Sequence, residues 1–274
     1  VLRVMGVYPS MWDALTESSR GARVARWAYR APFALALCTQ DGSGGERWLP
    51  EALRPGTPFR MLLNGFDGSA RSIAIDSRLE TIPDDRTIVL FVGRFESIKG
   101  CEEFADAILQ LHAEGRRDIH AVMIGTGRLR EGVQVRVDAG DMFTFIDRLA
   151  HDQVPEAHRR SDIYVSLNRL GQLSNDNLEA MSMGACMIVP EAQPERGIDL
   201  ATEALIDDAS VLRLPWTNQT AALTDALRRL TASPENQDVL RANMKATADK
   251  LVHSWDARVA EEFALIGEIT GQKP

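Results

Sequence analysis

The feature that most constrains the fold is a regular alternation of short apolar runs with amphipathic segments between residues 87 and 215. The run TIVLFVG (87–93) is continuously apolar and ends in glycine, which is typical of a strand buried on both faces. CEEFADAILQLHAEG (101–115) follows with an apolar stripe at helical spacing. This alternation predicts an α/β fold, a Rossmann-like doubly wound parallel sheet covered by helices.

The other elements of this region are predicted from the same two patterns. Strands are expected at 119–127, 142–146, 162–167, 185–190 and 210–215, and helices at 128–138, 154–161, 177–184, 218–231 and 234–251. Ligands of such sheets bind beyond the carboxyl ends of the strands. The segments that follow the strands are therefore where binding residues are expected.

The N-terminal quarter of the chain is less regular. A helix is predicted over 12–32, with Arg20, Arg23, Arg26 and Arg30 along one side, and strands at 33–38 and 59–67. The polar, turn-rich stretch 68–86 is predicted to be a linker. We therefore expect the remnant of a second, N-terminal lobe at 1–67, and a ligand-binding domain with C-terminal helices at 87–274.

Composition narrows the class of protein further. A net charge of −8 argues against a surface that binds nucleic acid throughout. The cysteines at 38, 101 and 186 are odd in number and widely spaced, which favours a reducing compartment over a disulfide framework or a zinc cluster. No apolar run reaches membrane-spanning length, so a cytoplasmic protein is expected. The first residue is Val1, which suggests that the chain is a fragment.

Basic residues follow the first strand of the regular region, in GRFESIKG (93–100). Gly93 lets the backbone approach a ligand closely, and Arg94 and Lys99 precede a helix whose N-terminus carries partial positive charge. These features suit a diphosphate. Two solvated surface cations are the simpler interpretation of this motif on its own.

A glycine turn, IGTG, ends the second strand. Gly125 and Gly127 could admit a nucleotide base or phosphate, although a plain turn is the simpler interpretation of this motif on its own. The third glycine of the dinucleotide fingerprint and its later acid are absent. A nicotinamide dehydrogenase is therefore disfavoured.

The fourth strand is followed by the amide-rich stretch SNDNLE (174–179). Glu179 is predicted in the first helical turn, either as an acid stabilised by the helix dipole or as the acceptor of two ribose hydroxyls. Ser174, Asn175, Asp176 and Asn177 could cap the helix or donate to a sugar and its phosphates. The three motifs each follow a parallel strand and should converge on one crevice, which favours a sugar nucleotide as the ligand.

Several segments resemble the donor-binding half of retaining glycosyltransferases with the GT-B fold, the group 1 class (family 4). They are VLFVGRFESIKG, VMIGTG, SDIYVSL and NLEAMSMGACMIV, and the resemblance extends over residues 59–266 with LLNGFD and HSWD in the same order. The resemblance implies a glycosyltransferase that moves a sugar from a nucleotide-diphosphate donor with retention of configuration. No divalent metal is expected, because Arg94 and Lys99 could stabilise the leaving diphosphate and the sequence has no Asp-x-Asp pair. The resemblance implies no cofactor beyond the donor, and a glycan, lipid-linked or small-molecule acceptor.

The resemblance also implies roles for particular residues. Arg94 and Lys99 would hold the donor diphosphate, and Glu179 would bind the ribose as the second acid of the E-x7-E motif. The first acid of that motif is replaced by Gly171, so sugar recognition would fall to Ser174, Asn175 and backbone N–H groups near Leu173. Asp147 is a second departure, since the family often has glycine there.

Some alternatives stay open at this level. A GT-B sugar-nucleotide epimerase and a non-catalytic nucleotide-sugar-binding module share these motifs. About 65 residues before the linker are too few for an acceptor lobe with its own parallel sheet, so most of that lobe is expected to be missing. The arginines of 12–32, joined by Trp27 and Tyr29, could dock on anionic lipid at the inner face of a membrane, whereas an ordinary surface helix is the simpler interpretation.

Overall fold

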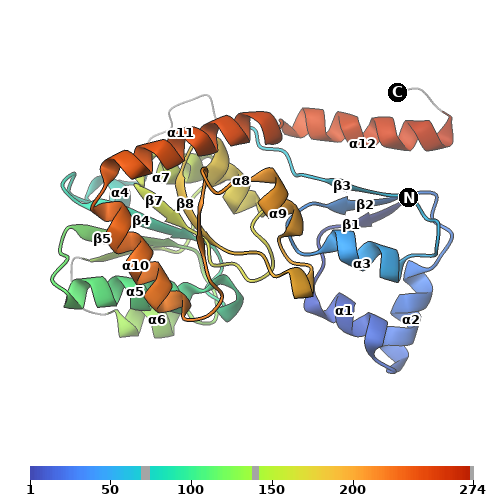
Figure 1. Cartoon of the computed structure of the whole chain (residues 1–274), viewed down its shortest axis with the longest axis horizontal. Coiled ribbons are helices and arrows are strands. Elements are labelled where there is room, and N and C mark those ends of the chain that lie inside the picture. The colour runs from blue at the N-terminus through green and yellow to red at the C-terminus, as the bar shows by residue number, and fades with distance from the viewer. Residues whose placement is uncertain (69–74, 138–141, 272–274) are drawn as a thin grey trace.

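The protein was analysed as a computed structural model that describes residues 1–68, 75–137 and 142–271. Two parallel sheets lie side by side, each with its own helices (Figure 1). The smaller sheet has the order β1-β2-β3 and the larger one β6-β5-β4-β7-β8-β9. We refer to residues 1–67 as the first unit and to residues 75–251 as the second unit.

The helices of the first unit pack on one face of its small sheet. Its elements are β1 (Leu2–Val4), α1 (Pro9–Thr16), α2 (Arg20–Tyr29), β2 (Ala36–Thr39), α3 (Gly45–Ala52) and β3 (Phe59–Leu62). Trp48 and Leu49 of α3 are fully buried against β2, where Ala36 and Cys38 face the same cluster. The expectation that this part of the chain is too short for a parallel sheet was wrong, because three short strands suffice.

The second unit confirms the predicted doubly wound fold. Its elements are α4 (Ser77–Glu80), β4 (Thr87–Val92), η1 (Ser97–Lys99), α5 (Cys101–Ala113), β5 (Ile119–Ile124), α6 (Arg130–Arg136), β6 (Phe143–Ile146), η2 (His151–Gln153), α7 (Val154–Arg160), β7 (Ile163–Val165), α8 (Asn175–Ser182), β8 (Cys186–Pro190), η3 (Pro194–Arg196), α9 (Leu200–Leu205), β9 (Leu212–Leu214), α10 (Gln219–Thr231) and α11 (Pro234–Leu251). The strand order reverses direction between β4 and β7. Ligands of doubly wound sheets bind at this switch point.

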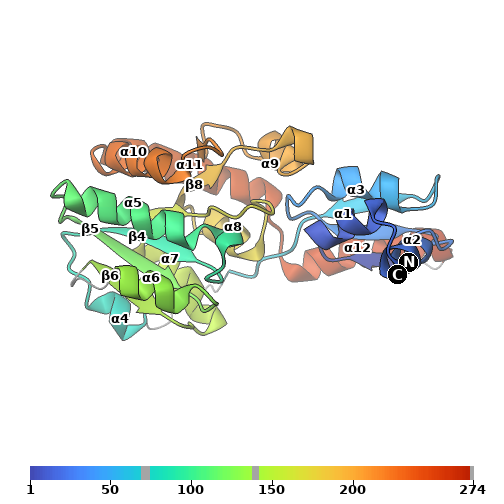
Figure 2. The same ribbon diagram turned by 90° about the horizontal axis from the view of Figure 1, so that it is seen from below.

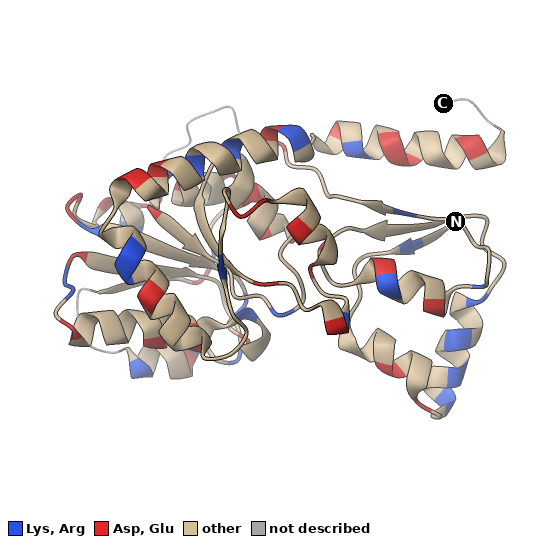
Figure 3. Cartoon of the chain, in the orientation of Figure 1, with Lys and Arg blue, Asp and Glu red and all other residues tan. Residues whose placement is uncertain are grey.

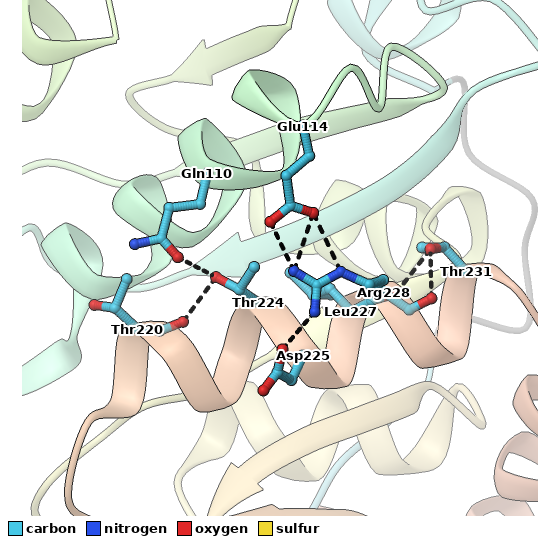
Figure 4. Close-up of polar contacts among 8 residues, drawn as sticks. All are labelled: Gln110, Glu114, Thr220, Thr224, Asp225, Leu227, Arg228 and Thr231. Atoms are coloured by element: carbon cyan, nitrogen blue, oxygen red, sulfur yellow. Dashed lines mark hydrogen bonds and ion pairs between the residues drawn. The ribbon is translucent and has the colours of Figure 1, made fainter.

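Both faces of the larger sheet are buried, as the continuous apolar runs predicted. Alternate residues of β4 point to opposite faces: Val89 and Phe91 join the cluster under α5 and α10, whereas Ile88 and Leu90 join the cluster under α8 and α11. The helices α5 and α10 are also joined at their surface. There Arg228 pairs with Glu114 at 2.7 Å and Thr224 donates to Gln110 at 2.9 Å (Figure 4).

The last helix, α12 (Trp255–Thr270), leaves the second unit and runs along the first (Figure 2). Its Leu265 and Ile266 pack on Leu35, Leu37 and Leu62 of the smaller sheet. The chain therefore crosses between the units twice, near residues 64–67 and 252–255, and the crossings are hydrogen-bonded to each other. The Phe66 N–H donates to the carbonyl of residue 253 at 2.9 Å, and Asp67 Oδ1 accepts from the Trp255 N–H at 3.0 Å.

The predicted helix over 12–32 is wrong, because the chain forms two helices that break at residues 17–19. The side chain of Arg26 stabilises the break by donating to the carbonyls of Ala14 and Glu17 at 2.6 and 2.7 Å. Arg26 therefore does not share an outer face with the other arginines of the segment. Tyr29 does not either, because its ring packs edge-on against Trp48 with centroids 4.8 Å apart.

Other short helices were not predicted at all. These are α3, α4 and α9, and α4 lies within the stretch predicted to be a linker. Residues 69–74 of that stretch lie outside the described residues, and the boundaries at 67 and 87 stay a prediction. None of the helices in the described ranges combines the length and the apolarity that a membrane crossing requires.

Candidate active site between the two units

A cavity of about 130 Å³ lies where the switch point of the larger sheet faces the first unit. Both units contribute polar side chains to its wall, namely Asp41, Ser43, Arg94, Lys99, Asn168 and Ser174. The second-unit members follow β4 and β7, the strands on either side of the switch point. The structure thus brings three of the sequence-predicted residues, Arg94, Lys99 and Ser174, to one place.

Lys99 is the half-buried cation of this cavity. It ends the short helix η1, and the side chain of Leu167 and the glycine turn at Gly100 fix the start of α5 beside it. Burial lowers the pKa of Lys99, while the carboxylate of Asp176 opposes that shift. Because the Lys99 amine is partly removed from water, a further anion such as a bound phosphate would stabilise its charged form.

Arg94 lies on the outer side of Lys99. Its guanidinium is largely exposed and pairs with Glu96 at 3.4 Å. An exposed pair of this length contributes little to stability, so Arg94 is free to rotate toward a ligand. Fixed and mobile cations at one cavity can together hold the two charges of a diphosphate.

The start of α8 forms another wall. Ser174 occupies the N-cap position without a side-chain capping bond, so its hydroxyl lines the cavity instead. Asn175 is exposed, and its Oδ1 accepts a hydrogen bond from Asn64 of the first unit at 2.7 Å. The first N–H groups of α8 have no partner within the helix, which makes its start suited to oxygen atoms of a ligand.

Asn177 has a structural role rather than a ligand-binding one. Its Oδ1 accepts from the buried Tyr164 hydroxyl at 2.9 Å, and its Nδ2 donates to both the backbone and side-chain oxygens of Gln172 at 3.0 Å. All three side chains are buried, so these bonds are costly to break. The network holds the loop before α8 in position.

Glu179 lies deeper than expected. Because α8 begins at Asn175, Glu179 falls in the second turn, and the prediction of a first-turn acid was wrong. Its side chain is 9% exposed, and its Oε1 lies 3.9 Å from Nδ1 of the exposed His151. Burial and the neighbouring Asp176 raise the pKa of Glu179 to about 7. Glu179 lies outside the lining of the cavity around Lys99, although a carboxyl whose pKa is perturbed in this way is typical of a functional site.

The raised pKa predicts how nucleotide binding depends on pH. If ionised Glu179 accepts two hydroxyls, affinity for a nucleoside diphosphate should fall about tenfold from pH 8 to pH 6, beyond the effect of phosphate protonation. The Glu179→Gln variant should show only the phosphate effect in calorimetric titrations. An equal pH dependence in both proteins would contradict this role.

Stability should change with pH in the opposite direction. Folded Glu179 binds its proton more tightly than the unfolded chain does, so the free energy of unfolding should decrease as pH rises from about 4.5 to about 7. Urea denaturation of the wild type and of Glu179→Gln measures that difference.

The glycines after β4 and β5 bring two loops together. At Gly125 (φ +138°) a Cβ would lie 2.0 Å from the carbonyl oxygen of Gly93, and at Gly127 it would lie 2.5 Å from that of Phe95. Gly93 itself lies against the stem of Lys99. These glycines therefore have a packing role that fixes the Lys99 loop, and their contact with a ligand stays a prediction.

Gly171 is explained by the contact between the units. A Cβ at this position (φ +122°) would lie 2.4 Å from the carbonyl oxygen of Asp41 and 2.8 Å from the Cα of Gly42. The Leu173 N–H donates to the same Asp41 carbonyl at 3.1 Å. No side chain fits at Gly171 in this arrangement, and the Leu173 N–H proposed for sugar recognition is already paired.

The buried Asp199 and the half-buried Asp41 lie at this contact. Asp199, at φ +60°, accepts from the Gln172 N–H at 2.7 Å and from the Thr202 hydroxyl at 2.6 Å, and burial raises its pKa to about 7. Its own N–H donates to the carbonyl of Gly42 at 2.8 Å. Asp41 accepts from the Ser43 N–H at 2.9 Å, and burial raises its pKa as well.

Sequence reasoning missed the residues that the first unit contributes. Asp41 and Ser43 lie in QDGSGG, a glycine-rich stretch directly after a strand, and that position was the available signal. The other departure from the family pattern, Asp147, pairs with Arg130 at 3.0 Å, and the Arg130 guanidinium covers the Phe145 ring at 4.3 Å. Asp147 is thus part of the surface beside β6.

The profile of the family "Glycosyl transferases group 1" matches residues 86–233, more than half of the 274 residues. The chain therefore belongs to this family. An alpha-D-kanosaminyltransferase from Streptomyces kanamyceticus is 28% identical over 163 residues, which cover 58% of this chain and 40% of that protein.

Solved structures agree on the fold. A sucrose-phosphate synthase from Thermosynechococcus elongatus matches with a TM-score of 0.75 at 18% identity, over 98% of this chain and 68% of that one. Anabaena HepE, solved with UDP and glucose, matches with a TM-score of 0.71 at 13% identity, over 96% and 70%. The predicted GT-B fold is thereby confirmed.

Proposed function

We propose that the protein uses the cavity around Lys99 to transfer a sugar from a nucleoside-diphosphate donor to a hydroxyl acceptor. The observation that carries this proposal is the convergence of Arg94, Lys99 and the start of α8 on the switch point of the sheet. Anabaena HepE, which has a similar fold, was solved with UDP-glucose, and this supports the same class of donor here.

The proposed chemistry needs charge stabilisation above all. The bond between the sugar C1 and the diphosphate oxygen breaks, and its electron pair leaves with the nucleoside diphosphate. The acceptor oxygen bonds to C1, and its proton passes to the leaving phosphate. Lys99 and Arg94 lie where they would stabilise the negative charge that grows on the diphosphate, more strongly in the transition state than in the donor.

We further propose that configuration is retained and that no metal ion takes part, because the two cations supply the positive charge. Ribose would be bound by Glu179, and the sugar by Ser174 and Asn175. No three His, Cys, Asp or Glu side chains are grouped as metal ligands within residues 1–68, 75–137 and 142–271. The expected result is a product with the donor's anomeric configuration by NMR, at a rate that EDTA leaves unchanged. An inverted product, or loss of activity with EDTA that Mg²⁺ restores, would contradict it.

The fate of the donor separates transfer from the alternatives. An epimerase would release an altered free sugar or sugar nucleotide without an acceptor, and a binding module would return the donor intact. The match to the kanosaminyltransferase spans 40% of that protein, so the activity is proposed for the protein to which these residues belong. That most of an acceptor lobe is missing from the sequence stays a prediction.

The α2 surface is proposed to contact anionic lipid. Arg20, Arg23 and Arg30 are exposed on α2 and at its end, next to Trp27, which is 79% exposed. Figure 3 shows basic bands along this helix. Because the net charge of the whole chain is −8, this group of arginines is a local basic surface on an acidic protein, which suits binding to anionic lipid. We expect the protein to sediment with phosphatidylglycerol vesicles, and we expect this binding to be lost at high salt and in Trp27→Ala. Equal sedimentation with phosphatidylcholine vesicles would contradict the proposal.

A further inference from the structure

A carboxylate of the first unit shares the cavity around Lys99 with the two cations. Asp41 follows β2 and lines this cavity together with Arg94 and Lys99. Burial lowers the pKa of Lys99, and the charges of Asp176 and Asp41 oppose that shift, so Asp41 acts on the lysine electrostatically. The same negative charge would repel a bound diphosphate. Asp41 is therefore unsuited to hold the diphosphate, and a different part of a ligand would have to contact it.

The Asp41 side chain is held in one orientation on its loop. Its Oδ1 accepts from the Ser43 N–H at 2.9 Å and from the Ser43 hydroxyl, and that hydroxyl in turn accepts from the Val7 N–H at 2.7 Å. The Asp41 carbonyl is fixed as well, because the Leu173 N–H of the second unit donates to it at 3.1 Å. A carboxylate held in this way needs little further ordering when it meets a ligand.

The second carboxylate oxygen of Asp41, Oδ2, is left for another partner. No side chain within residues 1–68, 75–137 and 142–271 donates a hydrogen bond to it. A Cβ at Gly6 (φ +109°) would lie 2.2 Å from this oxygen, so glycine at that position makes room for it. The bonds that fix the loop use only Oδ1. Oδ2 can therefore accept from a hydroxyl group of a ligand.

The replacement at position 171 places Asp41 beside a missing acid. The first acid of the E-x7-E motif would stand at 171, where this chain has glycine. The Asp41 carbonyl oxygen lies 2.4 Å from the place that a Cβ at 171 would take. The backbone of Asp41 thus occupies the space of the missing side chain, while its carboxylate lines the cavity from the opposite unit.

We propose that Asp41 binds the transferred sugar of the donor, with Oδ2 accepting from its hydroxyl groups. The inference rests on the proposed transferase function, in which Ser174 and Asn175 bind the same sugar from the second unit. The acid for the sugar then comes from the first unit and the cations for the diphosphate from the second, so the donor is held correctly only when the two units are in contact. A nucleoside diphosphate without a sugar gains nothing from Asp41.

The Asp41→Asn variant tests this role because it changes little else. Its Oδ1 can still accept from Ser43, whereas the charge and the acceptor at Oδ2 are lost. Calorimetry on the full chain compares UDP, GDP and ADP with UDP-glucose, GDP-mannose and ADP-glucose. We expect affinity for the preferred sugar nucleotide to fall about tenfold, as for a lost hydrogen bond to a charged group. Affinity for the same nucleotide without its sugar should stay equal or rise, because a charge that repels the diphosphate is removed.

Glu46→Gln is the matched control. Glu46 lies on the neighbouring α3, carries the same charge as Asp41 and is outside the lining of the cavity around Lys99. The glutamine keeps the oxygen that accepts from Gln40, so this variant should change neither affinity.

The outcomes separate this inference from the proposed function. A sugar nucleotide that binds Asp41→Asn as tightly as the wild type would overturn the assignment of Asp41 and leave the donor site standing. An equal loss of affinity for the nucleotide and for its sugar-bearing form would do the same, because it would show a structural role. Binding of no nucleotide and no sugar nucleotide to the wild type would overturn the donor site, and the assignment of Asp41 with it.

Discussion

Replacing Lys99 with alanine should lower the rate of sugar transfer about 10²–10³-fold, the loss seen when a preorganised charge-stabilising donor is removed. Lys99 is the half-buried cation of the cavity, and a water molecule in its place would not supply the positive charge that stabilises the diphosphate. The loss should appear mainly in kcat, because the diphosphate charge grows in the transition state. Arg94→Ala should lose less, since the Arg94 guanidinium is largely exposed.

Initial rates with a radiolabelled donor measure this effect. Lys245→Ala is the matched control, because Lys245 pairs with Asp249 on the surface of α11 and lies outside the cavity. Wild-type turnover in Lys99→Ala would remove Lys99 from the catalytic residues. An equal loss in both lysine variants would point to a general effect on the fold.

Replacing Gly42 with alanine should lower the free energy of unfolding by about 1–3 kcal/mol in addition to the cost of placing alanine in a left-handed backbone conformation. A Cβ at Gly42 would lie 2.3 Å from Asp199 Oδ1, 2.9 Å from the backbone nitrogen of residue 172 and 3.0 Å from the Cα of Gly171. Backbone from the second unit cannot move away as a flexible side chain can. The variant should therefore separate the two units and weaken nucleotide binding.

Gly56→Ala provides a control with the same backbone strain. Gly56 has the same φ of +84° as Gly42, but a Cβ there would meet nothing within 4 Å. Urea denaturation of both variants isolates the contact between the units from the cost of a left-handed residue. Equal destabilisation by the two substitutions would contradict the close approach of Gly42 to Gly171.

The second unit could be predicted from the sequence because its signals are local. The apolar runs of β4 and β5 and the stripe of α5 bury residues on fixed periods, so strand, helix and parallel order follow from the pattern. The position of Arg94 and Lys99 at the carboxyl end of β4 follows from the same pattern. Their approach to Ser174 was expected from the rule for parallel sheets, and the structure confirms it.

The contact between the units could not be predicted in this way. The pairing of Asp41 with Leu173 and of Gly42 with Asp199 joins residues far apart in the sequence, and no local pattern marks either partner. Gly171 was therefore interpreted as the loss of a ligand-binding acid, whereas the structure shows that it also makes room for the first unit. The helix break before α2 was missed although it has a local signal, because Ser19 caps α2 by accepting from the Ala22 N–H at 3.2 Å. The contacts of the Arg26 side chain with the Ala14 and Glu17 carbonyls add to this cap and are not visible in the sequence pattern.

The measurement that tests the central claim most directly is a calorimetric titration of the chain with UDP, GDP and ADP, repeated with Lys99→Ala and Glu179→Ala. We predict that one nucleotide binds in preference to the others and that both substitutions weaken its binding, because the proposal assigns the diphosphate to Lys99 and the ribose to Glu179. Binding of no nucleotide, or binding that neither substitution changes, would contradict a donor site at the junction of β4 and β7.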